Sequence, residues 1–127
     1  MQGKQLYEYA VIRVVPRVER EEFINVGVVL YIHGSRYICM RYMVPEERIL
    51  SLCSKVDMDE VRAYLHAFDQ ISHGAKDSGA IGRLDAASRF RWLTAYRSTI
   101  IQTSRVHPGF CIDPDAELQR LFEELVV

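Results

Sequence analysis

The residue types that could do chemistry are concentrated in the second half of the 127-residue chain. Residues 83–107 contain five arginines and one acid, so this basic segment carries a charge of about +4. Guanidinium groups bind carboxylate or phosphate in a bidentate manner, and an arginine cluster can therefore form an anion site. Within the segment, Arg97 is followed by the hydroxyl residues Ser98 and Thr99, a combination that suits phosphate oxygens. An anion site is one interpretation of this segment.

Two other interpretations of the basic segment need no small ligand. The residues from Asp113 onward contain five acids and one arginine, about −4 in charge, and this acidic tail could pair with the basic segment. Aromatic residues also alternate with the arginines, as in proteins that hold single-stranded nucleic acid by stacking; these are Phe90, Trp92 and Tyr96. The net charge of the whole chain is −1, which argues against a dedicated nucleic-acid-binding domain.

Metal and nucleophile chemistry has little support in the sequence. His66, Asp69 and His73 have the spacing of one helix face, but they lie beside Arg62 and lack a fourth donor nearby. No serine stands in a Gly-x-Ser-x-Gly pattern, and no Gly-Lys-Ser/Thr phosphate loop is present. The three cysteines are widely spaced, as is typical of free thiols in a reducing compartment. The sequence predicts no metal and no cofactor, and it favours a binding domain over an enzyme.

The elements that position these residues follow from the hydrophobic pattern. Residues 5–15 and 23–33 are rich in strand-forming residues on both faces, and each range predicts a covered strand. Gly34-Ser35 predicts a two-residue turn with glycine first, and residues 36–43 predict the returning strand. Gly27 inside the second strand indicates a bulge or a close backbone approach. These residues predict a three-stranded meander.

Asn25 stands at the start of the second predicted strand, in an otherwise apolar run. A buried asparagine must form hydrogen bonds. Asn25 either holds the charged loop of residues 17–22, which is expected to contain one helical turn, or contacts a ligand. Both interpretations remain open from the sequence.

Helices and one more strand are predicted in the rest of the chain. Capping residues and apolar stripes predict helices over residues 45–53, 57–72, 86–93 and from 113 to the C-terminal end. A β-branched run predicts a fourth strand over residues 98–106, ended by Pro108-Gly109, and the glycine-rich residues 74–82 predict a mobile surface loop.

The order of these elements predicts one α+β domain over residues 1–127. Its antiparallel sheet has about four strands, the meander plus one later strand, and helices cover one face. The chain is 49% hydrophobic and 26% charged, which excludes disordered, collagen-like and disulfide-rich classes. No apolar run approaches the ~20 residues of a membrane span, and no signal-peptide stretch is present. The sequence therefore predicts a cytoplasmic protein without membrane contact.

Two separated motifs point to a known family. The first is Tyr-Glu-Tyr-Ala-Val-Ile-Arg-Val-Val-Pro at residues 7–16, with Glu-Glu-Phe-Ile-Asn-Val-Gly-Val at residues 21–28. The second is Arg-Phe-Arg-Trp-Leu at residues 89–93 and Arg-Ser-Thr at residues 97–99, followed by Gln102, Ser104, His107 and Gly109. Together they resemble a bacterial family known only as domain of unknown function 3037. The chain departs from that family at Tyr96 and Arg105, where proline is more usual.

The resemblance implies an accessory role, because members of the family are often encoded beside a HipA-like kinase. It also carries over seven residues as a candidate anion or partner site: Arg13, Asn25, Arg91, Arg97, Ser98, Gln102 and His107. The leading hypothesis is a small accessory domain that binds a protein partner, a HipA-like kinase, through residues 89–107.

The alternative hypothesis is a domain or enzyme that binds a phosphorylated or carboxylated small molecule. Arg91 and Arg97 would clamp the anion, Ser98 and Gln102 would orient it, and His107 would act as acid or base. A weaker alternative is binding of single-stranded nucleic acid.

Overall fold

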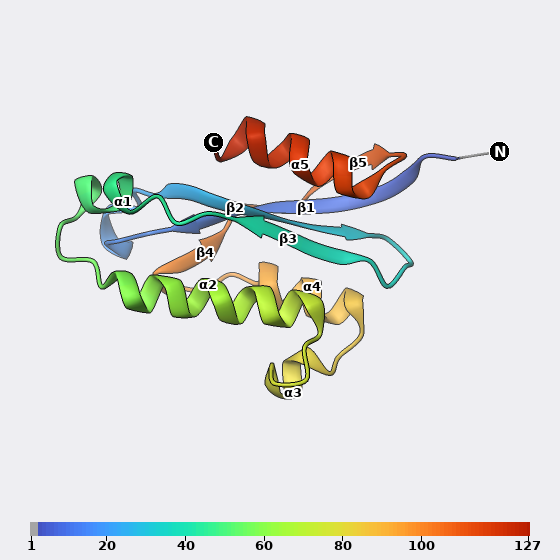
Figure 1. The fold of residues 1–127 in the computed structure, drawn as a ribbon, viewed down its shortest axis with the longest axis horizontal. Coiled ribbons are helices and arrows are strands. Elements are labelled where there is room, and N and C mark those ends of the chain that lie inside the picture. The colour runs from blue at the N-terminus through green and yellow to red at the C-terminus, as the bar shows by residue number, and fades with distance from the viewer. Residues whose placement is uncertain (1–2) are drawn as a thin grey trace.

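The computed structural model describes residues 3–127 and consists of one five-stranded sheet with helices packed on it (Figure 1). The elements in chain order are β1 (Gln5–Val14), the 3-10 turn η1 (Val18–Arg20), β2 (Ile24–Ile32), β3 (Ile38–Tyr42), α1 (Glu46–Leu52), α2 (Met58–His73), α3 (Gly79–Gly82), α4 (Ala86–Thr94), β4 (Ile101–Thr103), β5 (His107–Cys111) and α5 (Pro114–Leu125). The α+β class, the antiparallel sheet and the meander are confirmed. None of the helices in this described part is long and apolar enough to cross a membrane.

The long strand β1 holds the sheet together, because it pairs along both of its edges. The strand order is β3-β2-β1-β4, and β5 pairs with β1 on the same side as β4. β4 lies opposite residues 12–14 and β5 lies opposite residues 5–9. Between them, Ser104 donates its N–H to the Val11 carbonyl and accepts the Val11 N–H at its Oγ. β4 and β5 therefore act as one interrupted edge strand.

The predicted strand over residues 98–106 is wrong in its extent, because only Ile101–Thr103 is paired as β4. Pro108 and Gly109, predicted to end this strand, lie inside the missed strand β5. Proline is tolerated there because β5 is an edge strand that does not need every N–H for pairing. Position 109 requires glycine, because an added Cβ would lie 2.5 Å from the Tyr7 ring.

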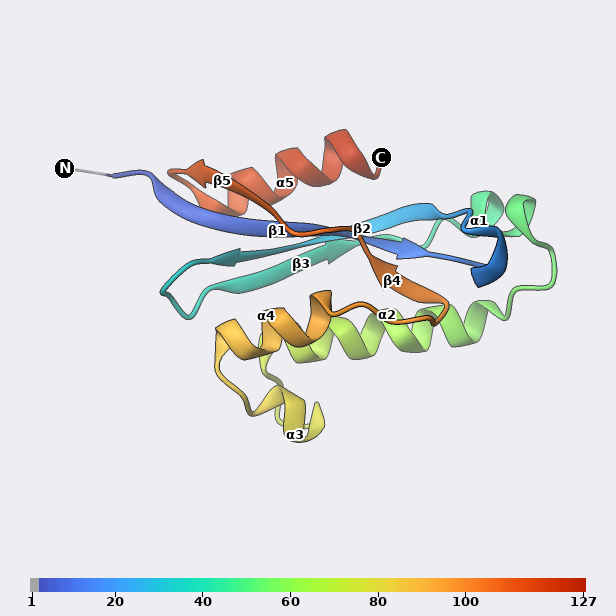
Figure 2. The ribbon, with the colours of Figure 1, turned by 180° about the vertical axis from the view of Figure 1, so that it is seen from behind.

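Helices cover both faces of the sheet, and the prediction of one covered face is wrong (Figures 1 and 2). Helices α2 and α4 pack on one face over Ala10, Ile12 and Val14 of β1. Helix α5 packs on the opposite face, where its predicted apolar stripe meets Tyr7 and Tyr9. The apolar side chains on both sides of β1 make this arrangement necessary, because each side needs its own cover.

A β-bulge interrupts the pairing of β1 with β2. Ile12 lies opposite Gly27, but the next residue, Arg13, lies opposite Asn25, so Val26 is the extra residue. A Cβ added to Gly27 would lie 2.8 Å from both the Arg41 carbonyl oxygen and the Tyr42 Cβ. The sequence-based prediction at Gly27 is confirmed in both of its forms, a bulge and a close backbone approach.

The hairpin between β2 and β3 is longer than predicted. Ile32 donates its N–H to the Tyr37 carbonyl, so residues 33–36 form a four-residue loop and not a two-residue turn. Gly34 has φ 76° and follows His33 inside the turn that Ser35 N–H closes on Ile32. The Ser35 hydroxyl explains the extra length, because it donates to the Ile32 carbonyl and accepts the Tyr37 N–H.

The helix boundaries follow their predicted caps closely. The Asp57 carboxylate accepts two N–H groups at the start of α2, and Gly74 ends that helix with φ 64°. Asp113 caps α5 in the same way, with Pro114 as the first helical residue. Residues 74–82, predicted as a loop throughout, contain the short helix α3.

Helix α5 is fastened to the sheet by two tyrosines near its first turn. The Tyr7 hydroxyl donates to Glu117 and the Tyr37 hydroxyl donates to Asp115. Burial and the bond to Glu117 raise the pKa of Tyr7 to about 12. Hydrogen bonding from Arg120, with a smaller contribution from Tyr7, lowers the pKa of Glu117 below its ordinary value.

Replacing Gly27 with alanine should lower the free energy of unfolding by about 1–3 kcal/mol, because the new methyl group has no room beside β3. Urea denaturation followed by circular dichroism measures this change. Gly3→Ala is the matched control, since nothing lies within 4 Å of its added Cβ, and it should change stability by less than about 0.5 kcal/mol. Equal effects of the two substitutions would contradict the packing argument.

Tyr7→Phe should cost about 1–2 kcal/mol near neutral pH, because the variant loses its bond to the Glu117 carboxylate. The pKa of Tyr7 is higher in the folded protein than in the unfolded chain, so its hydrogen bond contributes fully to stability below the unfolded pKa of about 10. This contribution is lost as pH rises through the folded pKa of about 12. The wild-type advantage should therefore shrink over that window. Urea unfolding at several alkaline pH values measures it, with Tyr9→Phe as the control. A constant difference across the window would refute the linkage.

Candidate anion-binding site

The structure brings three of the seven sequence-predicted residues together. Arg13 of β1 lies directly opposite Asn25 of β2 on one side and opposite Gln102 of β4 on the other. Directly opposed residues of antiparallel strands point to the same face, with Cβ atoms about 4.5–5.5 Å apart. The row Asn25–Arg13–Gln102 therefore crosses three neighbouring strands on the face that α5 covers.

The bulge explains why Asn25 belongs to this row. Val28 and Leu30 of β2 face α5, so strict alternation would turn Asn25 to the opposite face. The extra residue, Val26, reverses the phase and itself enters the core under α2 and α4. Asn25 then faces α5, where its side-chain Nδ2 donates to the Leu125 carbonyl at 3.0 Å.

Arg13 is a partly buried cation without a protein partner. Its guanidinium carbon lies 4.0 Å from the centroid of the Phe23 ring. Within residues 3–127 the guanidinium makes no hydrogen bond, no carboxylate lies within 4.0 Å of it, and its Nε is buried. Burial lowers the pKa of the group below its ordinary value. Arginines in such places are ordinarily paired, so Arg13 can accept an external anion.

Asn25 presents a second unsatisfied polar atom beside Arg13. Its Oδ1 is buried and has no hydrogen-bond partner among the described residues. The Nδ2 group has two N–H donors, and one of them is bound to the Leu125 carbonyl. A buried donor, Arg13 Nε, and a buried acceptor, Asn25 Oδ1, are therefore left unpaired on directly opposed residues.

A pocket of about 410 Å³ opens over Arg13, and we call it the Arg13 pocket. Its walls come from β1 and the residue after it, η1, the residues between η1 and β2, the segment after α4, and β4. The lining residues are Arg13, Val15, Val18, Glu19, Glu21, Phe23, Tyr96 and Gln102. The pocket therefore combines a cation, an amide, two carboxylates and two aromatic rings, of which the Tyr96 ring is 89% exposed.

Arg97, proposed as half of an anion clamp, closes the end of α4. Its guanidinium donates to the Leu93 and Trp92 carbonyls at 3.2 Å and 2.5 Å. It also lies 4.6 Å from the Trp92 ring centroid and 5.1 Å from that of Phe68. Burial lowers its pKa below the ordinary value. These contacts belong to a C-terminal helix cap.

The remaining four candidates, like Asn25, are not among the residues that line the Arg13 pocket, although Ser98 contacts one lining residue, Tyr96. Arg91 is exposed on α4 and donates to Ser88, and the Ser98 hydroxyl lies 3.2 Å from that of Tyr96. His107 is at the start of β5, with its ring 5.4 Å from the Tyr9 ring. The structure thus gathers Arg13, Asn25 and Gln102, and places the other four elsewhere.

The acidic tail does not neutralise the basic segment. Glu117 and Glu124 pair with Arg120 of the same helix at 2.6 Å and 3.0 Å. Arg89 of the basic segment donates to the carbonyls of Ile71, Ser72 and Leu84, which ties the end of α2 to the start of α4. Helix-end carbonyls, and not acids, are the partners of the buried arginines in this segment.

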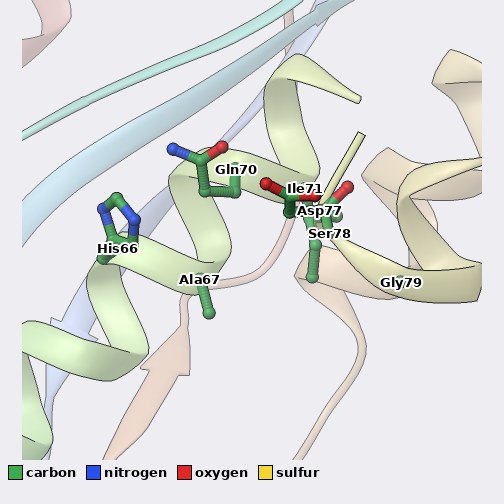
Figure 3. Close-up of a pocket in the computed structure, with 7 residues that line it drawn as sticks. All are labelled: His66, Ala67, Gln70, Ile71, Asp77, Ser78 and Gly79. Carbon is green, nitrogen blue, oxygen red and sulfur yellow. The ribbon is translucent and has the colours of Figure 1, made fainter. Parts of the chain in front are cut away.

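Another pocket, of about 580 Å³, lies between α2 and the segment that leads into α3 (Figure 3). His66 and Ser78 lie at opposite ends of it, and the Ser78 hydroxyl donates to the Ala75 carbonyl. This arrangement lacks a nucleophile paired with a base. Across residues 3–127, no three His, Cys, Asp or Glu side chains gather as a metal site. His73 and Asp69 form only a pair, 3.1 Å apart.

The sequence profile of the family described as Protein of unknown function (DUF3037) matches residues 9–126. The chain belongs to this family. The match extends from β1 to α5, so every lining residue of the Arg13 pocket lies inside the region that defines DUF3037. No curated protein and no solved structure matches the chain.

Six of the eight lining residues are not among the site residues predicted from the sequence: Val15, Val18, Glu19, Glu21, Phe23 and Tyr96. The sequence predicts Phe23 as the first residue of a covered strand, but it precedes β2 and packs on the Arg13 guanidinium. Glu21 has a left-handed backbone with φ 57°, which no local sequence pattern signals for a glutamate. The position of an aromatic residue, Phe23, directly after the charged loop of residues 17–22 is the one sequence signal that could have indicated this pocket.

Arg97→Ala should destabilise the protein by about 2 kcal/mol, because two charge-assisted bonds to the last turn of α4 are lost. Arg91→Ala on the same helix removes an exposed contact and should cost less than about 0.5 kcal/mol. Urea denaturation of both variants makes the comparison. A larger loss in Arg91→Ala would contradict the capping role.

Proposed function

We propose that this DUF3037 chain is a recognition domain that binds a carboxylate or phosphate group through Arg13. The observation that carries the proposal is the guanidinium itself, which is partly buried, stacked on Phe23 and unpaired within residues 3–127. Removing a cation from water is costly unless acceptors replace the lost hydration. An anion in the Arg13 pocket would supply those acceptors in the bidentate geometry that arginine favours.

The neighbours of Arg13 support binding. The side chain of Gln102 donates to the Thr99 carbonyl at 3.0 Å, which fixes its amide at the pocket wall. Asn25 is fixed by its bond to Leu125. Polar groups that are held before the ligand arrives lose less conformational entropy on binding, and this raises affinity. The pocket volume also falls within the range of ordinary small-molecule sites, about 300–1,000 Å³.

A second candidate function is the binding of a protein partner, as an accessory domain. The observation that favours it is the edge strand β5, whose outer edge is paired with no strand in the described part of the chain. Phe110 and Ile112, at and just after this strand, are 65% and 62% exposed. An extended segment of a partner could add to such an edge. The partner implied by the family resemblance is a HipA-like kinase.

Nuclear magnetic resonance of ¹⁵N-labelled protein can observe Arg13 directly through its side-chain Nε–Hε signal, which Arg13→Lys identifies by its disappearance. Titration with acetate and with inorganic phosphate should move this signal in a saturable way, with affinity of about the millimolar range. Backbone amide shifts around the pocket should report at least ~10-fold weaker binding in Arg13→Lys, because lysine keeps the charge but loses the planar fork.

Arg36→Gln is the matched control, because Arg36 is exposed and lies outside the Arg13 pocket. It should bind both anions as the wild type does. The backbone spectrum of each variant reports whether it is folded. If neither anion moves the Arg13 signal at high concentration, the proposed function is wrong.

A further inference from the structure

We infer that the ligand of the Arg13 pocket carries a cation as well as a carboxylate, with Arg13 binding the carboxylate and Glu21 the cation. This inference rests on the proposed function and narrows its ligand class. It starts from the fact that Arg13 and Glu21 line one pocket but do not approach within 4.0 Å of each other. A ligand that enters the pocket therefore meets the positive charge of Arg13 and the negative charge of Glu21 as two separate groups.

Glu21 differs from its acidic neighbours in having no counter-charge. Glu19 pairs with Arg17 at 3.2 Å and Glu22 pairs with Arg20 at 2.7 Å. Within residues 3–127, the Glu21 carboxylate makes no ion pair and no side-chain hydrogen bond. The loop thus neutralises the two flanking carboxylates and leaves one charge directed at the pocket.

The backbone at Glu21 fixes the position of its Cα at the edge of the pocket. Its φ of 57° lies in the left-handed region, and its N–H donates to the Val18 carbonyl to close η1. Glycine or asparagine would adopt this conformation at lower cost. A glutamate here gives the pocket a charge that the turn itself does not require.

The charge balance separates the possible anions. A phosphate that bears close to two negative charges would bind Arg13 while facing the carboxylates of Glu19 and Glu21. A singly charged carboxylate is repelled less, and an ammonium or guanidinium group on the same ligand gains from Glu21. The rings of Phe23 and Tyr96 supply surfaces for the carbon chain between the charges and for the cation. Both a free amino acid and an acidic–basic side-chain pair of a peptide have this chemistry.

The test compares butyrate with 4-aminobutyrate, which share a carbon chain and differ by the ammonium group. Both are titrated while the Arg13 Nε–Hε signal and the backbone amides of residues 18–23 are observed. We expect 4-aminobutyrate to bind about five-fold more tightly than butyrate, the size expected of one exposed ion pair. Inorganic phosphate should bind no better than butyrate.

Glu21→Gln should reduce the advantage of 4-aminobutyrate over butyrate to less than two-fold, and it should not weaken butyrate binding, because the substitution removes a carboxylate that faces the bound anion. Glu19→Gln should keep most of the advantage, because Glu19 is already paired with Arg17. Glu47→Gln, at an exposed glutamate on α1, is the control outside the pocket and should keep all of it. A capped dipeptide, acetyl-Asp-Lys-amide, tests the second source, and tighter binding of the dipeptide than of 4-aminobutyrate would assign the ligand to a peptide.

The possible results separate the two proposals. Equal binding of butyrate and 4-aminobutyrate, or tighter binding of phosphate, with the Arg13 signal moving in each case, would overturn the inference and leave the proposed function standing. Failure of every probe to move the Arg13 signal would overturn both.

Discussion

The bulge at Val26 is the constraint on which the rest of the structure depends. It changes the phase of β2, so that residues on either side of it serve opposite layers: Leu30 faces α5 and Val26 faces α2 and α4. The same change sets Asn25 beside Arg13 and away from the apolar layer. Gly27 makes this local geometry compatible with the sheet, because only a residue without Cβ fits against Tyr42 of the adjacent strand. One added residue therefore places Val26 in the core under α2 and α4 and Asn25 in the polar row with Arg13 and Gln102.

The arginines of the chain illustrate why a local charge excess is a poor guide to a site. Arg89 and Arg97 lie in the most basic segment, yet their guanidinium groups donate to backbone carbonyls at the ends of α2 and α4. These two guanidinium groups are therefore already hydrogen-bonded within the fold. Arg13, which stands in a segment without charge excess, donates to no protein acceptor within residues 3–127. Whether an arginine has a protein acceptor depends on the tertiary structure, and a local charge count does not report it.

Much of the fold was predictable because its signals are local. The caps at Asp57 and Asp113, the stop at Gly74 and the bulge at Gly27 depend on residues within one turn or one strand. The strand β5 was not predictable, because proline and glycine end strands in most contexts. Pro108 and Gly109 fit a strand here only because β5 pairs at the edge of β1, where Gly109 packs against Tyr7. The site was predictable in part: Arg13, Asn25 and Gln102 came from the family resemblance, but their adjacency follows from strand register. An aromatic residue beside a charged loop is the only sequence signal for the Phe23 contact, and the backbone of Glu21 leaves none.

Helix α5 links stability to the site. Its first turn is bound to the sheet through Tyr7 and Glu117, and its last turn accepts the Asn25 side chain at the Leu125 carbonyl. That bond uses one N–H of the Asn25 amide and fixes the side chain next to Arg13 on the opposed strand. The helix that covers this face of the sheet therefore also fixes the Asn25 side chain in the row Asn25–Arg13–Gln102. The pocket is consequently preorganised by the same packing that stabilises the domain, which is the condition for specific binding by few groups.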